Sequence, residues 1–232
     1  MWDDVQALRK LTNVLFGAGL LLVLIGVLGY VLRLPAFALR AVQLDFAPQR
    51  VDRVQLAGAV RDSLHGNFFT VNLDQARQTF EKLPWVRRVG VRRHFPWQLD
   101  VELEEHVALA RWNGTALVNT EGEVFAAKDA DALPEFSGPD GAAEEMARRY
   151  ARFSEMLAPL GQDIAQLTLS SRHAWQLRLK DGLVVELGRE QMEERLARFA
   201  AAYRQFQAAM KSPPKYVDLR YRNGFAARAA AG

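Results

Sequence analysis

The chain has 232 residues, half of them apolar and a quarter charged, which is the composition of a folded protein with one large or two modest domains. The formal net charge of +3 is small and does not indicate nucleic-acid binding, which would require a concentrated basic stripe with a matching motif. The absence of cysteine excludes disulfides, thiolate nucleophiles and cysteine metal sites.

The sequence lacks the usual signatures of catalysis and metal binding. Its four histidines do not fall at metal-ligand spacings, and no G-x-S-x-G, H-E-x-x-H or glycine-rich phosphate loop occurs. A catalytic group assembled from distant residues would leave no such signature. We nevertheless expect no enzyme activity, no catalytic residue, no metal, no cofactor and no small-molecule substrate.

One long apolar segment lies near the N-terminus. Residues 11–32 carry no charge, and ~22 residues in a helix span ~33 Å, enough for a hydrocarbon core of ~30 Å. A cleaved signal peptide is the alternative, because Ala36-Phe37-Ala38 matches an A-x-A cleavage pattern, but the segment exceeds the ~7–15 apolar residues of an ordinary signal. We predict a retained transmembrane helix over residues 11–34, after a tail of residues 1–10. Positive charges flank both ends, so they do not give the orientation.

A compact α/β pattern follows in residues 37–106. Alternating apolar residues within 38–46 predict a strand, Asp52 is the predicted N-cap of one helix, and Asn72 or Asp74 begins a second. A hairpin of two strands completes this pattern. The resulting order is strand, helix, helix, strand, strand.

The register of this hairpin follows from its sequence. In an antiparallel pair, facing residues point to the same side, so apolar side chains must meet apolar ones. A three-residue loop at residues 95–97 satisfies this rule on one face and opposes unlike charges on the other, whereas a two- or four-residue loop would set valines against acids. The predicted pairs are Arg88–Glu104, Val89–Leu103, Val91–Val101 and Arg92–Asp100.

The arginines of the hairpin leave two interpretations open. They form either a partner-binding patch or a solvated face that the neighbouring acidic strand partly neutralises. The order of elements, directly after a membrane segment, resembles a POTRA domain, a module that docks peptides and proteins.

Residues 107–225 are predicted to form an antiparallel sheet covered by helices. Asn113-Gly114 is a two-residue hairpin signal, and residues 180–182 fit a three-residue hairpin with Gly182 in the left-handed region. That second hairpin should pair Leu177 with Val185 and Trp175 with Leu187. Apolar stripes at helical spacing predict helices over residues 142–160 and 192–210.

The stretch KYVDLRYRNG, residues 215–224, is predicted to be the last strand, before a tail of residues 226–232. Its edge is either open for a strand from another chain, or it is occupied because the strand is central or covered by the tail. An open edge offers backbone hydrogen bonds to an incoming strand, and side chains then select that strand.

Three stretches together resemble the FtsQ/DivIB family of bacterial cell-division proteins. They are LPWVRRVGVRRHFPWQLDVELEEHVALARWN at residues 83–113, RLARF at 195–199 and YVDLRY at 216–221. The likeness runs over essentially the whole chain. The overall expectation is an α+β protein with one N-terminal transmembrane helix, a POTRA domain and a helix-covered β-domain.

The resemblance implies a non-enzymatic bitopic scaffold of the inner membrane, with a cytoplasmic N-terminus and a periplasmic bulk, at the division septum. Such proteins bind FtsB and FtsL and help to recruit and regulate septal cell-wall synthesis. In the family, FtsB adds a strand to the last strand of the β-domain and lays a short helix nearby. The alternative is a POTRA-containing component of protein transport or outer-membrane assembly, which would require a cleaved signal and normally a following β-barrel.

The resemblance also assigns site residues by position. Arg220 would pair with an acidic partner residue, Tyr221 would fill an apolar contact, and Arg172 would contact the acidic helix. The full set expected to bind FtsB is Arg172, Tyr216, Arg220, Tyr221, Asn223 and Gly224. Arg88, Val91 and Arg93 align with POTRA positions that recruit other division proteins. Phe225 departs from the family, in which a small residue often follows this glycine.

Overall fold

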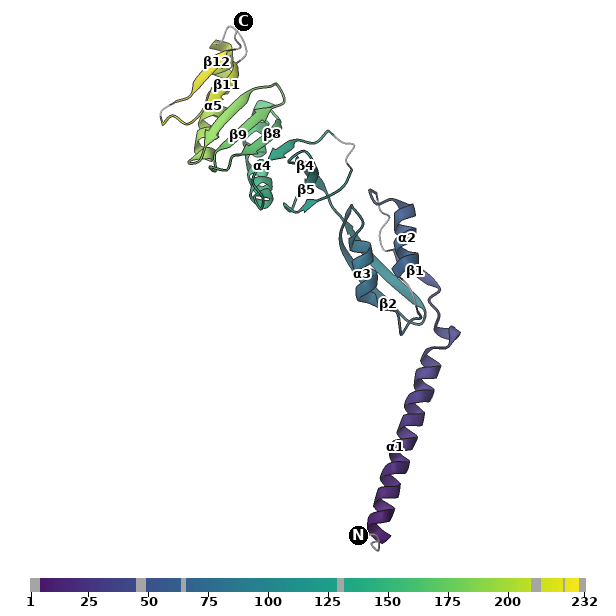
Figure 1. Cartoon of the computed structure of the whole chain (residues 1–232). Helices are drawn as coiled ribbons and strands as arrows, with labels where there is room; N and C mark the ends of the chain where they lie inside the picture. The colour runs from purple at the N-terminus through teal and green to yellow at the C-terminus, as the bar shows by residue number, and fades with distance from the viewer. Residues whose placement is uncertain are drawn as a thin grey trace. The chain divides into compact units, whose positions relative to one another are not determined.

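The computed structural model describes residues 5–44, 49–63, 66–128, 132–209, 214–222 and 224–229. The chain separates into two compact units, residues 1–105 and residues 106–232 (Figure 1). Each unit has its own sheet, as the order of predicted elements indicated.

The first unit begins with the helix α1, Val5–Leu32. Its span Arg9–Leu32 is 24 residues long, is apolar enough to cross a membrane and is not buried inside the protein. The helix ends before Pro35, because proline disfavours helical backbone at the preceding residue, and Leu34 is extended. The short 3-10 helix η1, Pro35–Phe37, follows. The long apolar helix α1 fits a single-pass membrane protein.

The rest of the first unit has the predicted order of strand, helix, helix, strand, strand. The elements are β1 (Ala41–Leu44), α2 (Arg53–Ser63), α3 (Leu73–Glu81), β2 (Val86–His94) and β3 (Gln98–Glu105). Asp52 precedes α2 and its Oδ1 accepts from the Val54 amide, and Asn72 caps α3 by accepting from the Gln75 amide. The sheet order is β1-β3-β2, with β1 parallel to β3.

The predicted hairpin register of β2 and β3 is confirmed. All four predicted pairs, Arg88–Glu104, Val89–Leu103, Val91–Val101 and Arg92–Asp100, face each other across the ladder. The apolar partners on β3, Leu99, Val101 and Leu103, are buried. Ion pairs on the other face run diagonally, from Arg92 to Glu102 at 3.1 Å, because long side chains reach past the residue directly opposite.

The second unit is built on a nine-stranded sheet with two long helices, α4 (Ala143–Leu157) and α5 (Met192–Ala209). The strands are β4 (Ala108–Trp112), β5 (Ala116–Asn119), β6 (Val124–Phe125), β7 (Glu135–Ser137), β8 (Ile164–Leu169), β9 (Trp175–Leu179), β10 (Val184–Gly188), β11 (Pro214–Asp218) and β12 (Ala226–Ala229). A short 3-10 helix, η2 (Ala158–Leu160), follows α4. The sheet order is β12-β11-β10-β9-β8-β7-β4-β5-β6.

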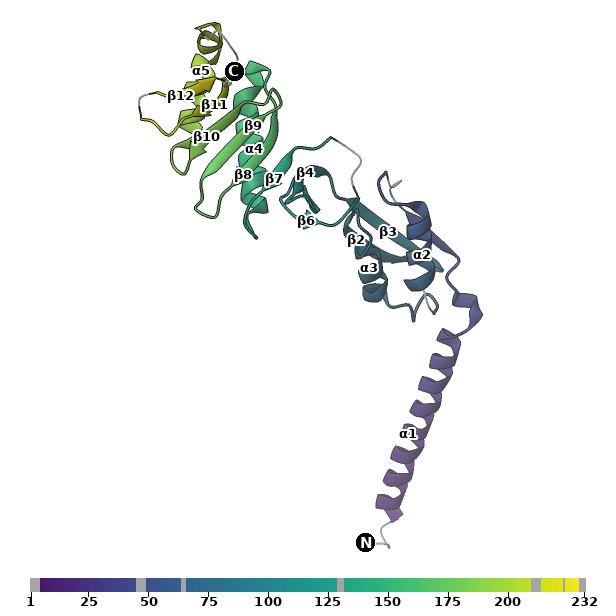
Figure 2. The same ribbon diagram turned by 45° about the horizontal axis from the view of Figure 1, so that its top comes forward.

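The sheet is mixed, whereas the sequence predicted an antiparallel one. β4 pairs with β7, β7 with β8, and β10 with β11 in parallel. Parallel neighbours need a long crossover, and α4 and α5 provide it between β7 and β8 and between β10 and β11. The two helices pack against the sheet next to each other (Figure 2). An ion pair from Arg149 to Glu193 at 2.9 Å joins them.

The two hairpins predicted in this unit form, each with a local difference. Asn113 and Gly114 both have positive φ, but the connection has three residues, because Trp112 faces Ala116. Gly182 has φ 91° and Leu177 faces Val185, as predicted. Trp175 faces Gly188 instead of Leu187, because a bulge follows Glu186.

The core of the second unit lies between the sheet and its two helices. The largest side chains that are fully buried there include Phe136 on β7, Phe153 on α4, Leu177 on β9 and Phe199 on α5. Phe153, Leu177 and Phe199 belong to the apolar stripes and alternations that the sequence showed. Phe136 does not, because the sequence predicted a loop over residues 133–141, where the structure has β7. The core stops at β11, where Val217 is buried, while the described side chains of β12 are exposed.

Candidate partner-binding site

The last strand of the sheet is β12 and not the stretch 215–224. β11 pairs on one side with β10 and on the other with β12, so both of its edges are occupied. The prediction that this stretch is the last strand with an open edge is therefore wrong. The alternative that the following segment covers that edge is confirmed, because residues 226–229 form β12. The chain folds back after β11 and adds one more strand, so in the described part of the chain the strands with a single neighbour are β12 at this end of the sheet and β6 at the other.

This pairing covers Tyr216. Its ring is half-buried on β11, and the guanidinium of Arg228 on β12 lies 5.9 Å from the ring centroid. Burial is the main reason why the pKa of Tyr216 lies above its ordinary value, and the carboxylates of Asp218 and Glu186 add to this. Tyr216 therefore lies beside the protein's own last strand, and the Arg228 side chain of that strand covers part of its ring.

Arg220 already has a carboxylate partner within the chain. Its Nη2 donates to Asp218 Oδ2 at 2.6 Å, and its Nε donates to both oxygens of the same carboxylate. These hydrogen bonds hold the pKa of Asp218 below its ordinary value, and they raise the pKa of Arg220. Asp218 is buried, whereas 57% of the Arg220 side chain is exposed. The carboxylate of Asp218 therefore orients the guanidinium, and the rest of the guanidinium faces solvent.

Tyr221 and Gly224 lie in the connection between β11 and β12, and both are exposed. Tyr221 is 57% exposed, which makes it the most exposed large apolar side chain described in the second unit after Val107. Asn223 falls outside the described residues. An exposed tyrosine in the connection that leads into β12 is suited to an apolar contact with another chain.

Phe225 anchors the start of β12. Its ring packs edge-on against Phe199 at 5.5 Å and against Phe206 at 5.1 Å, both on α5. A small residue at this position would remove both contacts. The departure from the family pattern is therefore a packing device that holds β12 to the helix layer.

The sheet brings Arg172 to the same end as Arg220. Arg172 is exposed in the turn before β9, whose first residue, Trp175, faces Gly188 at the end of β10. Gly188 has φ 80°, and a Cβ there would lie 3.0 Å from Cγ of Arg220. Glycine is needed for both reasons, since positive φ strains other residues and the side chain would displace Arg220.

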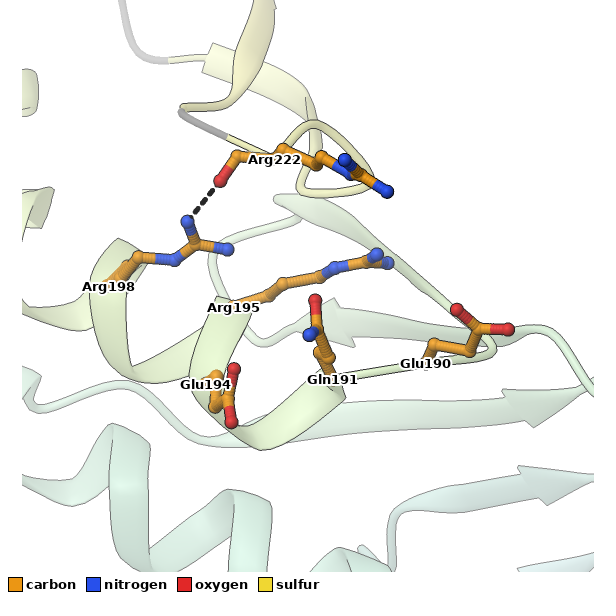
Figure 3. A pocket seen from close by; sticks show the side chains of 6 residues that line it. All are labelled: Glu190, Gln191, Glu194, Arg195, Arg198 and Arg222. Atoms are coloured by element: carbon orange, nitrogen blue, oxygen red, sulfur yellow. Dashed lines mark hydrogen bonds between the residues drawn. The ribbon is translucent and has the colours of Figure 1, made fainter.

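A basic groove lies between α5 and the β11–β12 connection, next to the end of the sheet that carries Arg220. The sequence did not predict this groove. One pocket of about 490 Å³ shares Arg195 and Arg198 with a second pocket of about 240 Å³ (Figure 3). The lining residues are Glu190, Gln191, Glu194, Arg195, Arg198 and Arg222 in the first pocket, and Arg195, Arg198, Ala202, Leu219, Gly224 and Phe225 in the second. We call these two pockets the arginine groove.

Two arginines give the groove a fixed basic wall. Arg195 Nη1 donates to the Leu187 carbonyl at 3.0 Å, and Arg198 Nη1 donates to the Arg222 carbonyl. Arg195 Nε is buried and finds no hydrogen-bond partner in the described part of the chain. The i, i+3 spacing of Arg195 and Arg198 within RLARF was the signal available in the sequence.

The three predicted POTRA residues lie on two faces of β2. Arg88 is exposed on the face that carries the diagonal ion pairs, whereas Val91 and Arg93 belong to the other face, with buried Val89. Arg93 donates from Nε to the Phe68 carbonyl at 2.8 Å and from Nη2 to the Val71 carbonyl at 2.9 Å. Arg93 therefore holds the loop between α2 and α3 against the hairpin.

Within the described residues, no group of three histidine, aspartate or glutamate side chains is placed to hold a metal ion. The site is a strand edge flanked by exposed arginines and a tyrosine. These groups could bind a peptide strand through backbone hydrogen bonds, an apolar contact and positive charge.

Comparison with known proteins agrees with this organisation. The sequence model described as the C-terminal part of cell division protein FtsQ/DivIB matches residues 110–220, and that of the FtsQ-type POTRA domain matches residues 37–106. Proteins named cell division protein FtsQ are similar over nearly their full length. The one from Nitrosospira multiformis is 42% identical over 98% of this chain and 99% of its own. Those from Burkholderia pseudomallei and Neisseria gonorrhoeae are 39% and 35% identical, each over 99% of this chain and 95% and 96% of their own. The chain therefore belongs to the FtsQ/DivIB family of bacterial cell-division proteins.

Proposed function

We propose that the chain is a non-enzymatic division scaffold that captures FtsB, in complex with FtsL, on the outer edge of β12. The observation that carries this proposal is the position of β12 at the end of the nine-stranded sheet, where, among the described residues, it pairs with β11 alone. An unpaired edge exposes a row of backbone donors and acceptors that another strand can satisfy.

The composition of β12 supports this use of its edge. Its sequence, Ala-Ala-Arg-Ala, has three small side chains, no proline and no acidic residue. Proteins usually protect an exposed edge with charge, proline or a covering element, and here a single arginine is present. Small side chains let an incoming backbone approach closely.

The side chains around the edge supply the selection. Tyr221 offers an exposed apolar surface, and Arg172 and Arg220 lie at the same end of the sheet. The arginine groove adds Arg195 and Arg198 beside the β11–β12 connection. A partner with a short strand followed by an acidic helix would match this arrangement, in line with the family resemblance.

The Asp218–Arg220 pair refines the expected role of Arg220. A partner carboxylate meets a guanidinium whose orientation is already set by a buried acid, so little side-chain entropy is lost on binding. We propose that Arg220 binds the partner while it remains paired with Asp218.

We place α1 across the inner membrane, with the N-terminus in the cytoplasm and both folded units in the periplasm, at the division septum. In that setting, Arg88 on the open face of β2 is the residue of the POTRA set that remains available to recruit other division proteins and so to regulate septal cell-wall synthesis. Family membership favours this function over a role in protein transport.

Site-specific photocrosslinking in growing cells tests the edge directly. A photoreactive residue at Ala227 on β12 should crosslink to FtsB. The matched control is Val124 on β6, which is exposed at the opposite end of the same sheet and should give no such product. Equal crosslinking at both positions, or none at Ala227, would contradict the proposal.

A proline scan separates backbone pairing from side-chain contact. Successive residues of an edge strand direct their amides alternately toward the neighbour and outward. Proline at Ala227 and at Arg228 should therefore behave differently. Proline at the residue whose amide points outward should abolish FtsB capture and leave the melting temperature unchanged. Proline at the residue whose amide points toward β11 should abolish capture and lower the melting temperature. If both keep full capture, the partner does not pair with β12.

Tyr221→Glu should reduce co-purification of FtsB from membranes by placing a charge in the apolar contact.

A further inference from the structure

A second exposed apolar surface lies at the end of the POTRA unit that joins α1. We call it the aromatic end and define it as Phe37, Phe69, Phe95 and Trp97. Phe37 packs on Phe69 with ring centroids 5.1 Å apart, and the buried Phe68 bridges Phe69 and Phe95 at 5.1 Å and 5.9 Å. Phe95 is 70% exposed, and Phe69 and Trp97 are each 41% exposed. Contiguous exposed apolar patches are rare on soluble proteins and mark interaction or membrane surfaces.

Hydrogen bonds tie the aromatic end to the last turn of α1. Asn67 Nδ2 donates to the Leu32 carbonyl, and the backbone of Asn67 forms an isolated antiparallel β-bridge with Ala38. The Phe68 amide donates to the Phe37 carbonyl at 2.8 Å, and the Arg40 amide donates to the Trp97 carbonyl at 3.0 Å. Because an asparagine side chain is short, the loop that carries Phe69 lies close to the point where the apolar helix ends.

The loop that carries Phe69 is also fixed internally and to β2. Asn67 Oδ1 accepts from the amides of Phe69 and Thr70, each at 3.0 Å. Arg93 on β2 clamps the carbonyls on either side of this loop. The exposed rings are therefore displayed by a braced surface.

Positive charge accompanies the rings. Arg33 directly follows α1, and the Arg40 guanidinium lies 4.9 Å from the centroid of the Trp97 ring. Asp100 is the acid placed near this turn, and its carboxylate contacts His94 at 3.0 Å. Aromatic rings with arginines next to an apolar span are typical of the membrane–water interface, where rings sit at headgroup level and arginines meet lipid phosphates.

We propose that the aromatic end rests on the bilayer surface, with Phe69, Phe95 and Trp97 among the lipid headgroups and Arg33 and Arg40 on anionic phosphates. The lipid surface is the occupant that the structure favours, because the hydrogen bond from Asn67 to Leu32 places the patch directly next to the apolar surface of α1. The protein then sets the tilt of its POTRA unit without any partner chain. This inference needs α1 in the bilayer and is independent of the β12 edge.

The absence of cysteine makes the test simple, since one introduced cysteine gives one labelled site. The full chain is reconstituted in nanodiscs that contain phosphatidylglycerol, with a nitroxide label at Phe95→Cys. The matched control is Val54→Cys. Val54 is also an exposed apolar residue, at 73%, and it lies at the start of α2, away from the aromatic end. A label at Leu24→Cys in α1 reports that the helix is inserted.

Collision with oxygen, which concentrates in lipid, is compared with collision with a water-soluble nickel chelate. The Phe95 label should collide with the nickel chelate several-fold less often than the Val54 label, while the Leu24 label confirms insertion. Equal nickel accessibility at Phe95 and Val54 in the inserted protein would overturn the proposal. Protection of the Phe95 label that develops only after other membrane proteins are added would also overturn it, in favour of a protein contact.

A ring-deletion variant shows that immersion depends on the patch. With the label at Trp97→Cys, changing Phe69 and Phe95 to serine should raise the nickel collision rate toward that of Val54. Replacing Arg33 and Arg40 with glutamine should weaken immersion in phosphatidylglycerol more than in phosphatidylcholine. If the Trp97 label is immersed equally in all these variants, the rings and arginines do not hold the surface to the lipid.

Discussion

The two strand pairs β2–β3 and β11–β12 differ in how their partners are chosen. In β2–β3, each strand carries an alternation of apolar and charged side chains, and one register satisfies both faces. In β11–β12, the outer strand is Ala-Ala-Arg-Ala and has no alternation. The first pair is specified by its own side chains. The second is specified by what surrounds it, chiefly the packing of Phe225 on α5.

This difference shows why the open edge was assigned to the wrong strand. An alanine-rich segment buries little apolar area, so its own sequence contributes little to the choice between strand and coil. The connection through residues 219–225 brings it beside β11, whose inner edge is taken by β10. Because the side chains of β12 contribute little to its own stability, an added partner strand can stabilise it.

The largest expected effect breaks the pair that side chains specify. Leu99 lies on β3, the middle strand of the three-stranded sheet, and its side chain is fully buried. Leu99→Ala should therefore lower the free energy of unfolding of the first unit by about 3 kcal/mol. Urea unfolding of the full chain in micelles, with hydrogen exchange of the β2 and β3 amides, measures it. A loss below ~1 kcal/mol would show that the buried face does not determine this hairpin.

The next effect concerns the pair held by its surroundings. Phe225 is partly buried, so Phe225→Ala should cost about 2 kcal/mol, less than a fully buried phenylalanine. Exchange of the β11 amides should accelerate while the POTRA amides are unchanged, and FtsB capture should fall. The matched variant Tyr221→Ala should reduce capture but alter stability by less than ~0.5 kcal/mol, because Tyr221 is exposed. Unchanged β11 exchange in Phe225→Ala would mean that β12 is not anchored through this ring.

A smaller effect depends on pH at the junction of β11 and β12. Because Arg220 lowers the pKa of Asp218 below its unfolded value, the native state binds this proton less tightly than the unfolded state. The stabilisation is complete above the unfolded pKa of ~3.9 and is lost as pH falls through the lowered native pKa. Asp218→Asn should be less stable than wild type at neutral pH, and its stability should fall less in acid. Parallel acid profiles of the two proteins would exclude the pair as a source of stability.

The smallest effect concerns the exposed charges of the hairpin. Arg92 pairs with Glu102 at 3.1 Å, but the two side chains are largely in water. Arg92→Ala should therefore change stability by no more than ~0.5 kcal/mol, and salt should reduce even that difference. A loss above ~1 kcal/mol that salt does not reduce would show that the opposed charges, together with the buried face, determine the register.

Much of the fold was predictable, because the signals were local. The apolar span of α1, the caps Asp52 and Asn72, and the left-handed Gly182 each depend on a few neighbouring residues. The mixed sheet was accessible in principle, since a long helix between two strands permits parallel pairing. It was missed because alternation within a strand does not say which neighbour the strand will have.

The candidate site was predicted less completely. Arg172, Arg220 and Tyr221 came from the family resemblance, and the structure places them at one end of the sheet. Arg195 and Arg198 were not predicted to belong there, because two arginines on an exposed helical face resemble an ordinary solvated surface. Their position became meaningful only when α5 packed beside the β11–β12 connection and formed the arginine groove.

By itself, the sequence of this protein determined its helices and most of its strands, its division into an apolar helix and two folded units, and the register of β2 with β3. These features depend on residues that are close in the chain or on alternations that only one pairing satisfies. The tertiary structure alone decided which strand lies at the edge, which arginines share a groove and which rings remain in water near α1. Those outcomes depend on contacts between distant segments, such as Phe225 with α5 and Asn67 with Leu32, and no local pattern encodes such contacts.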